Sequence, residues 1–162
     1  MSDLSVNPVN TLEIVSGGQT GVDQGALSAA LDAHNRCGGW CPAGRRSEDG
    51  PIPARYPVKE LEGSDYKART RQNVTDSDGT AIIYFETLEG GTALTVTYCR
   101  EERKPFVLID TASLSVDRAV ADLQTFVREH DIRVLNVAGP RRSKWSNAYD
   151  EAYGLVAALL RQ

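Results

Sequence analysis

The fold class of this chain is decided by three consecutive segments: residues 11–16 (Thr-Leu-Glu-Ile-Val-Ser), residues 17–21 (Gly-Gly-Gln-Thr-Gly) and residues 22–34, from Val22 to His34. A short β-branched run that breaks at glycines and continues with apolar residues at helical spacing predicts a strand, a tight loop and a helix. The same order returns along the chain. The further expected strands are residues 80–85, 106–110 and 132–138, and the further expected helices are residues 64–74, 93–103, 114–130 and 145–160.

Strands that are apolar almost throughout, and that alternate with helices, predict a parallel sheet buried on both faces. We therefore expect an α/β fold, a Rossmann-like three-layer sandwich with a mainly parallel central sheet. Residues 11–162 form one expected domain after a loose lead-in, residues 1–10. Residues 38–63 are too rich in glycine and proline for long regular structure, and such a segment is more often functional than accidental.

The composition of the 162-residue chain restricts its partners. Lys and Arg total 18 against 22 Asp and Glu, a net charge of -4, which argues against general binding to nucleic acid or to an anionic membrane. No apolar run approaches the ~20 residues that a membrane span needs, and the N-terminus lacks a signal-peptide pattern. The 3 cysteines, without a CxxC spacing, fit reduced thiols. We expect a cytoplasmic protein.

Glycine-bearing turns follow three of the expected strands. Ligands of parallel sheets bind beyond the carboxyl ends of the strands, where such turns present backbone N–H groups and helix N-termini. A phosphate or another oxyanion is the expected guest, and the alternative is that the glycines only permit tight turns. The first turn matches neither the dinucleotide GxGxxG pattern nor the P-loop. The candidate ligand-binding residues in these turns are Gly17, Gly18, Gln19, Thr20, Gly21, Gly90, Gly91, Thr92 and Gly139.

Two clusters of basic residues lie in expected loops of this acidic chain. Guanidinium groups bind phosphate oxygens two at a time, so both clusters are candidates for fixing an oxyanion. The alternative is a solvated charge run. Ser143 is also a candidate cap for the last helix. The candidates in the two clusters are Arg45, Arg46, Arg141, Arg142, Ser143 and Lys144.

Asp23 lies at the start of the first expected helix, three residues after Thr20. This is the spacing of a capping box, in which Asp23 satisfies a backbone N–H. The alternative is a carboxylate that holds a ribose hydroxyl or a metal beside the anion site. Arg69 and Asn73, four residues apart, share one face of another expected helix. Asp23, Arg69 and Asn73 are all candidate ligand-binding residues.

Glu48, Asp49, Asp76 and Asp78 are carboxylates that could serve as a base or as a metal ligand. Asp49-Gly50 and Asp78-Gly79 are typical turn formers, which accounts for both acids without chemistry. If a carboxylate acts chemically, Asp78 and Glu48 are the candidate catalytic residues, and Asp78 also belongs to the candidate ligand-binding set.

Trp40 and the group His34, Cys37 and Cys41 complete the candidates. Trp40, in the irregular segment, suits stacking on a flat ring, and the alternative is that it closes the core. The histidine and the two cysteines have no zinc-finger spacing and lack a fourth ligand, so no metal site is expected.

Taken together, these motifs resemble the putative molybdenum carrier family, a circularly permuted branch of the SLOG superfamily. The matching segments, in chain order, are residues 15–27, 39–46, 48–50, 52–53, 56–57, 69–70, 73–74, 76–80, 90–92 and 136–141. The resemblance implies a Rossmann-like fold related to nucleotide-sensing domains and to lysine-decarboxylase-like phosphoribohydrolases. It also implies a phosphate-bearing ligand, for which molybdenum cofactor and a nucleotide are the candidates, because both join phosphate to a flat heterocycle.

The phosphoribohydrolases that this chain resembles carry a glutamate shortly after a Gly-Gly-x-Gly-Thr turn. Residues 90–95 (Gly-Gly-Thr-Ala-Leu-Thr) lack the second glycine step and the acid, so hydrolysis would need a carboxylate from elsewhere. The leading hypothesis is a homo-oligomeric protein that binds molybdenum cofactor or a related phosphorylated heterocycle. The alternatives are a nucleotide N-glycoside hydrolase and a nucleotide-sensing module.

Overall fold

Strand β7 (Gly79–Tyr84) is buried along its whole length in the computed structural model, which describes residues 12–63 and 65–161. It pairs in parallel with β8 (Phe106–Asp110) on one side and with β9 (Val134–Ala138) on the other. β9 pairs with β1 (Glu13–Val15), which pairs with β2 (Cys37–Gly38), so the strand order is β2-β1-β9-β7-β8. The expected parallel sheet is confirmed.

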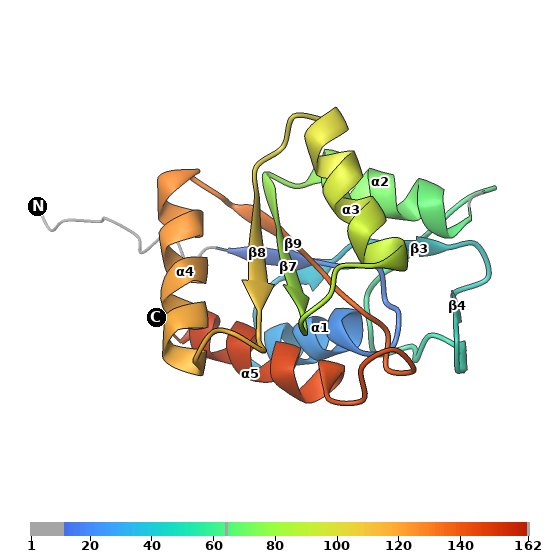
Figure 1. Cartoon of the computed structure of the whole chain (residues 1–162). Helices are drawn as coiled ribbons and strands as arrows, with labels where there is room; N and C mark the ends of the chain where they lie inside the picture. The colour runs from blue at the N-terminus through green and yellow to red at the C-terminus, as the bar shows by residue number, and fades with distance from the viewer. Residues whose placement is uncertain (1–11, 64, 162) are drawn as a thin grey trace, which may run out of the picture.

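Helices cover both faces of this sheet (Figure 1). α1 (Val22–Asp32), α4 (Val116–Glu129) and α5 (Ala148–Leu160) pack together on one face. α2 (Tyr66–Asp76) and α3 (Gly90–Glu101) pack together on the other face. This arrangement is the expected three-layer, Rossmann-like sandwich.

The close approach of α1 and α5 depends on Gly25. A Cβ at this position would overlap the backbone carbonyl oxygen of Tyr149 in α5, so a larger residue would push the two helices apart. The apolar core lies between these helices and the sheet, with Ile14, Leu135 and Leu155 among its buried members. Burial of such side chains is the main favourable term in folding.

Residues 38–63 contain short strands rather than long elements. β3 (Trp40–Pro42) pairs in parallel with β6 (Lys59–Leu61), and β4 (Arg46–Ser47) forms a hairpin with β5 (Gly50–Pro51). These strands lie beyond the β2 edge of the central sheet, on the side of α2 (Figure 1). The lead-in expected at residues 1–10 lies outside the described residues.

Two helices begin three residues away from their expected starts. α3 begins at Gly90 rather than at residue 93, because the first turn of a helix needs no internal N–H partners and tolerates glycine. α5 begins at Ala148 rather than at residue 145, because a turn in which the Trp145 N–H reaches the carbonyls of Arg141 and Arg142 comes first.

The chain reverses its winding between β9 and β7. The helix that follows β9, α5, covers one face of the sheet, and the helix that follows β7, α3, covers the other. Because β9 and β7 are neighbours, the connections that leave their carboxyl ends diverge. Ligands of doubly wound sheets bind in the crevice opened at such a point.

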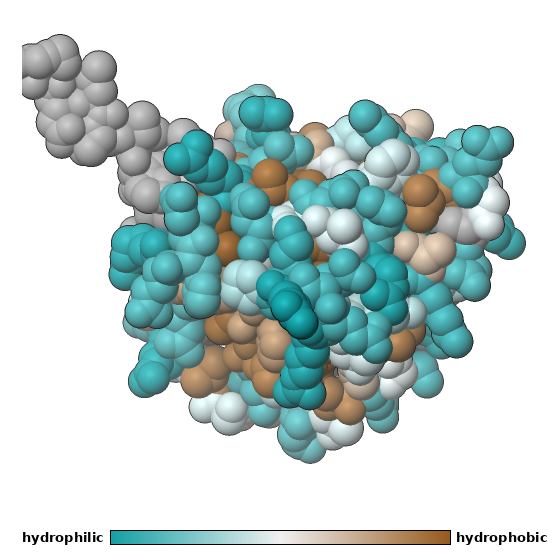
Figure 2. All heavy atoms as spheres, turned by 90° about the horizontal axis from the view of Figure 1, so that it is seen from above, coloured by the Kyte–Doolittle hydropathy of each residue, from teal (hydrophilic) through white to brown (hydrophobic). Residues whose placement is uncertain are grey.

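Apolar side chains reach the surface in places. Figure 2, seen from the side of α2 and α3, shows a mainly hydrophilic surface with separate apolar patches. The large apolar side chains that are exposed among the described residues are Tyr66, Phe85, Leu108 and Val116. Tyr66 and Phe85 both line the cavity described next, so aromatic surface is concentrated there.

Candidate functional site

A cavity of about 930 Å³ lies at the carboxyl edge of the sheet, where β9 and β7 diverge. This volume is in the range of small-molecule binding sites. All three predicted glycine-bearing turns contribute to the lining of the cavity. The predicted residues that line it are Gly17, Gln19, Asp23, Arg69, Asn73, Gly90, Gly91, Thr92, Gly139, Arg141 and Lys144. The structure thus gathers residues from four parts of the chain around one space.

The N-terminus of α3 faces this cavity without a cap. No side chain caps the helix at Glu89, and the N–H groups of Gly90, Gly91 and Thr92 have no hydrogen-bond partner among residues 12–63 and 65–161. A Cβ at Gly90 or Gly91 would meet no atom within 4 Å. Free N–H groups at the positive end of a helix dipole make an anion-binding position.

The glycine turn at residues 17–21 is filled by protein instead. A Cβ at Gly21, where φ is 82°, would lie 2.5 Å from the Pro140 oxygen, and a Cβ at Gly18 would lie 2.9 Å from Ile52. The N–H of Thr20 binds the side-chain oxygen of Gln19 (3.0 Å). Of this turn, Gly17 and Gln19 line the cavity, so it does not cradle a guest with all its amides as predicted.

Arg69 and Asp23 form a buried pair in the cavity lining. Nη1 of Arg69 lies 3.4 Å from Oδ2 of Asp23, and the two side chains are 14% and 5% exposed. Burial raises the pKa of Asp23 above its ordinary value, although Arg69 and the Gln19 N–H favour its ionised form. Gly21, not Thr20, precedes the helix and no side chain caps it, so the capping box is absent.

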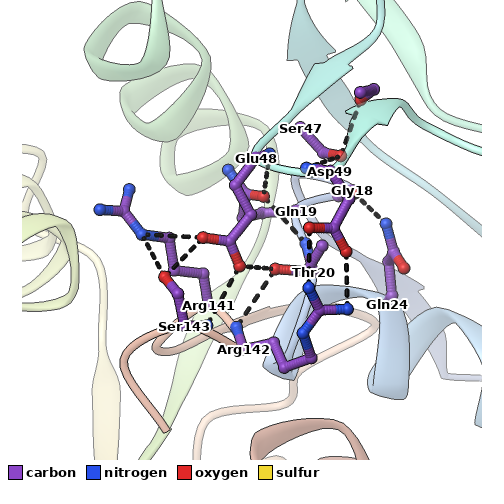
Figure 3. Close-up of polar contacts among 11 residues, drawn as sticks. Gly18, Gln19, Thr20, Gln24, Ser47, Glu48, Asp49, Arg141, Arg142 and Ser143 are labelled. Atoms are coloured by element: carbon purple, nitrogen blue, oxygen red, sulfur yellow. Dashed lines mark hydrogen bonds and ion pairs between the residues drawn. The ribbon is translucent and has the colours of Figure 1, made fainter. Parts of the chain in front are cut away.

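Glu48, at the tip of the β4–β5 hairpin, ties together the first and last glycine turns (Figure 3). Its carboxylate accepts hydrogen bonds from the hydroxyls of Thr20 and Ser143 and from the Ser143 N–H (3.1 Å), and it lies 3.3 Å from Nε of Arg141. Burial acts to raise the pKa of Glu48, but the bonds from Ser143 and Thr20 outweigh it and lower that pKa. We call these four residues the Glu48 clamp.

The clamp overturns two expectations. Ser143 does not cap α5, whose N-cap is Asn147, because its hydroxyl bonds to Glu48 at 2.5 Å. Glu48 does not line the cavity, and its four donors favour the ionised carboxylate, so its contacts are those of a structural link rather than of a base.

The other predicted cations point away from the cavity. The Arg45 guanidinium donates to the carbonyls of Val58 (2.8 Å), Pro53 (2.9 Å) and Tyr56 (3.0 Å), so it holds the irregular segment together. Arg46 bonds to the Ala43 carbonyl at 2.9 Å. The Arg142 guanidinium pairs with both oxygens of Asp49, at 2.7 and 2.6 Å, as Figure 3 shows.

Asp78 lies at the opposite edge of the sheet from the cavity. It precedes β7, and its carboxylate accepts the N–H groups of Arg133 (2.9 Å) and Val134 (2.8 Å) where β9 begins. These bonds fix the register of β7 and β9 at their amino ends. The candidate catalytic and ligand-binding role of Asp78 therefore has no support in its position.

Trp40 lies outside the cavity, where the side chain of Asn73 holds its backbone. The Asn73 amide accepts the Trp40 N–H (2.8 Å) and donates to the Trp40 carbonyl (3.0 Å), so it pairs α2 with β3 as a strand would. The Trp40 ring nitrogen donates to Asp76 at 2.7 Å. Asn73 lines the cavity while its amide serves the fold.

Sequence reasoning missed several residues of the lining. Phe85 follows β7, and its ring centroid lies 6.0 Å from that of Trp145, which precedes α5. Asn136 is a buried amide in the otherwise apolar strand β9, and such a polar residue was the available signal. Two further lining residues, Tyr66 and Lys67, begin α2.

The described residues hold no group of three or more His, Cys, Asp or Glu side chains that could bind a metal ion. Among the same residues, no helix has the length and apolar character that crossing a bilayer requires.

Comparison with known proteins adds to this geometry. The model of the circularly permutated YpsA SLOG family matches residues 14–160. The chain belongs to this family. A crystal structure titled "Putative molybdenum carrier protein", from Syntrophus aciditrophicus SB, is similar at 42% identity and a TM-score of 0.89, over 91% of this chain and 94% of that one. No curated protein sequence matches the chain. The resemblance stated from the motifs is confirmed.

Proposed function

We propose that this SLOG-family protein binds a phosphorylated heterocycle, with molybdenum cofactor and nucleotides as candidates, in the cavity between β9 and β7. The observation that carries the proposal is the uncapped N-terminus of α3, whose free N–H groups and two glycines border the cavity. The name of the similar solved structure supports a carrier or binding role.

Cations near this helix end support phosphate as the bound group. Arg141 and Lys144 line the cavity from the turn after β9, and Lys67 lines it from α2. Lys144 has no side-chain hydrogen bond or ion pair among the described residues, so its ammonium group is available to a ligand. Preorganised N–H groups together with such charges favour an oxyanion over a neutral group.

Aromatic side chains support the heterocycle. Phe85, which is 49% exposed, and Trp145 contact each other at the cavity, and Tyr66 lines it from α2. Exposed aromatic surface in a cavity is favourable for binding a flat ring. The helix N-terminus with its cations suits the phosphate of the proposed ligand, and the aromatic side chains suit its ring.

Gly91 gives the sharpest test. Gly91→Asp places a carboxylate in open space where the phosphate would bind, and an acid in the first turn of a helix does not destabilise it. Gly91→Asn is the matched neutral control. Calorimetry with GMP, inorganic phosphate and released molybdenum cofactor should show at least about tenfold weaker binding for Gly91→Asp than for Gly91→Asn, as like charges repel. Equal binding by the two variants, or no binding by the wild type, contradicts the proposal.

A second candidate function, hydrolysis of a nucleotide N-glycosidic bond, is favoured by Asp23. It is a buried carboxylate in the cavity lining that pairs with Arg69, and its raised pKa suits a general base. As the C–N bond breaks, water would add to the sugar carbon and lose a proton to Asp23, which would pass this proton to the departing base. Release of free base from a panel of nucleoside monophosphates, lost in Asp23→Asn, would establish it; no release by the wild type would exclude it for that panel.

A further inference from the structure

Nε of Arg69 is the one buried side-chain nitrogen or oxygen, among the described residues, that lacks a hydrogen-bond partner. The only hydrogen bond of this guanidinium within the described residues runs from Nη1 to Asp23, so the edge formed by Nε and Nη2 is unpaired. Buried donors are nearly always satisfied in folded proteins, because leaving one unpaired is costly. The exception lies in the lining of the candidate ligand cavity.

Neighbouring groups fix the plane of the Arg69 guanidinium. It lies against the backbone of Gly17, since a Cβ there would overlap Nη1. Asp23 holds Nη1 from the side, and the ring of Tyr66 lies 5.8 Å from Cζ. The orientation of the unpaired edge is therefore fixed, and a planar fork of two N–H donors matches a planar pair of adjacent acceptors.

The position of Asp23 selects among such acceptor pairs. An anionic partner at this edge would face the Asp23 carboxylate as well as Arg69, and the repulsion would offset much of the gain. A neutral acceptor pair makes the same two hydrogen bonds without that repulsion. On a flat heterocycle, a ring carbonyl oxygen beside a ring nitrogen provides such a pair.

We infer that the Nε and Nη2 edge of Arg69 binds an adjacent carbonyl-oxygen and ring-nitrogen pair of the bound heterocycle, as 6-oxopurines and fully oxidised pterins present. This inference rests on the proposed function, in which the phosphate occupies the N-terminus of α3. It adds a selection rule, because an arginine makes two hydrogen bonds to O6 and N7 of a guanine ring, whereas an adenine ring offers a donor in place of the oxygen.

Wild-type protein and modified nucleotides test the inference without any mutation. We expect GMP and IMP to bind alike, and AMP and 7-deaza-GMP, which lacks the ring-nitrogen acceptor, to bind at least about fivefold more weakly, the lower end of discrimination by such a pair. Neopterin phosphate, whose pterin ring carries the same acceptor pair, should bind within the range of GMP. If AMP and 7-deaza-GMP bind as tightly as GMP, the inference is wrong.

Arg69→Lys provides the second arm, because lysine keeps the charge beside Asp23 but loses the planar fork. This variant should bind GMP and AMP equally, and the ratio of these two affinities is the readout. Unequal binding by a folded variant overturns the role of Arg69, and thermal unfolding reports whether it folds. Failure of all phosphorylated compounds to bind the wild type is a different result, since it removes the proposed function itself.

Discussion

Two glycine turns at the same edge of the sheet have opposite surroundings. Every residue of the first turn, 17–21, is buried, and its glycines make room for protein atoms. Gly90 and Gly91, at the second, are exposed and meet nothing within 4 Å of an added Cβ. Similar sequence patterns therefore serve different purposes: one turn allows loops to pack, and the other leaves backbone donors open to a ligand.

Gly21→Ala should produce the largest effect. Its φ of 82° is unfavourable for alanine, and the new methyl group would lie 2.5 Å from the Pro140 oxygen and 2.8 Å from the Arg142 nitrogen. We expect a loss of about 2–4 kcal/mol in the free energy of unfolding, from strain and steric overlap together. Urea denaturation measures it. A variant as stable as the wild type would show that the first turn is not tightly filled.

Removal of the Glu48 carboxylate should have the next largest effect. Glu48→Ala leaves the Thr20 hydroxyl and the Ser143 N–H without their acceptor and removes the ion pair with Arg141, which should cost about 1–3 kcal/mol. Denaturant unfolding of this variant and of Ser143→Ala compares the free energy lost with the whole clamp with that lost when the Ser143 hydroxyl alone is removed. If Glu48→Ala costs no more than Ser143→Ala, the clamp does not act as a unit.

The clamp should also make stability depend on pH. The pKa of Glu48 in the folded chain is below its ordinary value of 4.5, so its contribution is complete above pH 4.5 and is lost as the pH falls through the lowered value. The difference in unfolding free energy between the wild type and Glu48→Gln should therefore shrink in acid. A difference that stays constant down to acid pH would contradict the assigned direction of the pKa shift.

The ion pair between Asp49 and Arg142 should contribute less, although it spans the hairpin and the last turn. Its side chains are 43% and 56% exposed, and exposed pairs contribute about 0–1 kcal/mol. Asp49→Asn should thus change the unfolding midpoint slightly, and added salt should reduce the difference further. A cost that equals that of Glu48→Ala would mean that the hairpin, rather than the clamp, secures the filled turn.

Gly91→Ala should have the smallest effect on stability, and of opposite sign. The methyl group enters open space in a helical turn, where alanine in place of glycine stabilises by up to about 1 kcal/mol. Calorimetric unfolding measures the gain, with Gly21→Ala as the matched comparison. Clear destabilisation by Gly91→Ala would show that the second turn is not as open as described.

The sequence predicts the layers of the fold well. Residues 106–110 match β8 exactly, and apolar runs that alternate with helices predict the parallel sheet. The predicted start of α3 lies three residues after the observed one. Gly90 and Gly91 have low helix propensity, but the first turn of a helix tolerates them. Local patterns determine such elements, and tertiary context shifts their ends.

The candidate site was less predictable, because the partner of a polar side chain is decided by distant segments. Arg45 and Arg141 both follow proline-bearing turns, yet Arg45 binds local carbonyls and Arg141 lines the cavity. The sequence predicts Asp78 as a turn former, whereas in the structure its carboxylate accepts the Val134 N–H and fixes the register of β7 and β9. Asn136 carried a signal, since a polar side chain inside an apolar strand needs a partner, which is Thr80 at 3.2 Å.

The position of β9 has a consequence for folding. The pairs β2–β1 and β7–β8 are joined within the sheet only through β9, which comes from residues 134–138, near the end of the described chain. The hydroxyl of Ser16 donates to the Val137 carbonyl across a separation of 121 residues. Because such long-range closure is entropically costly and slow, the two flanks must wait for this segment to leave the ribosome before they can become one sheet.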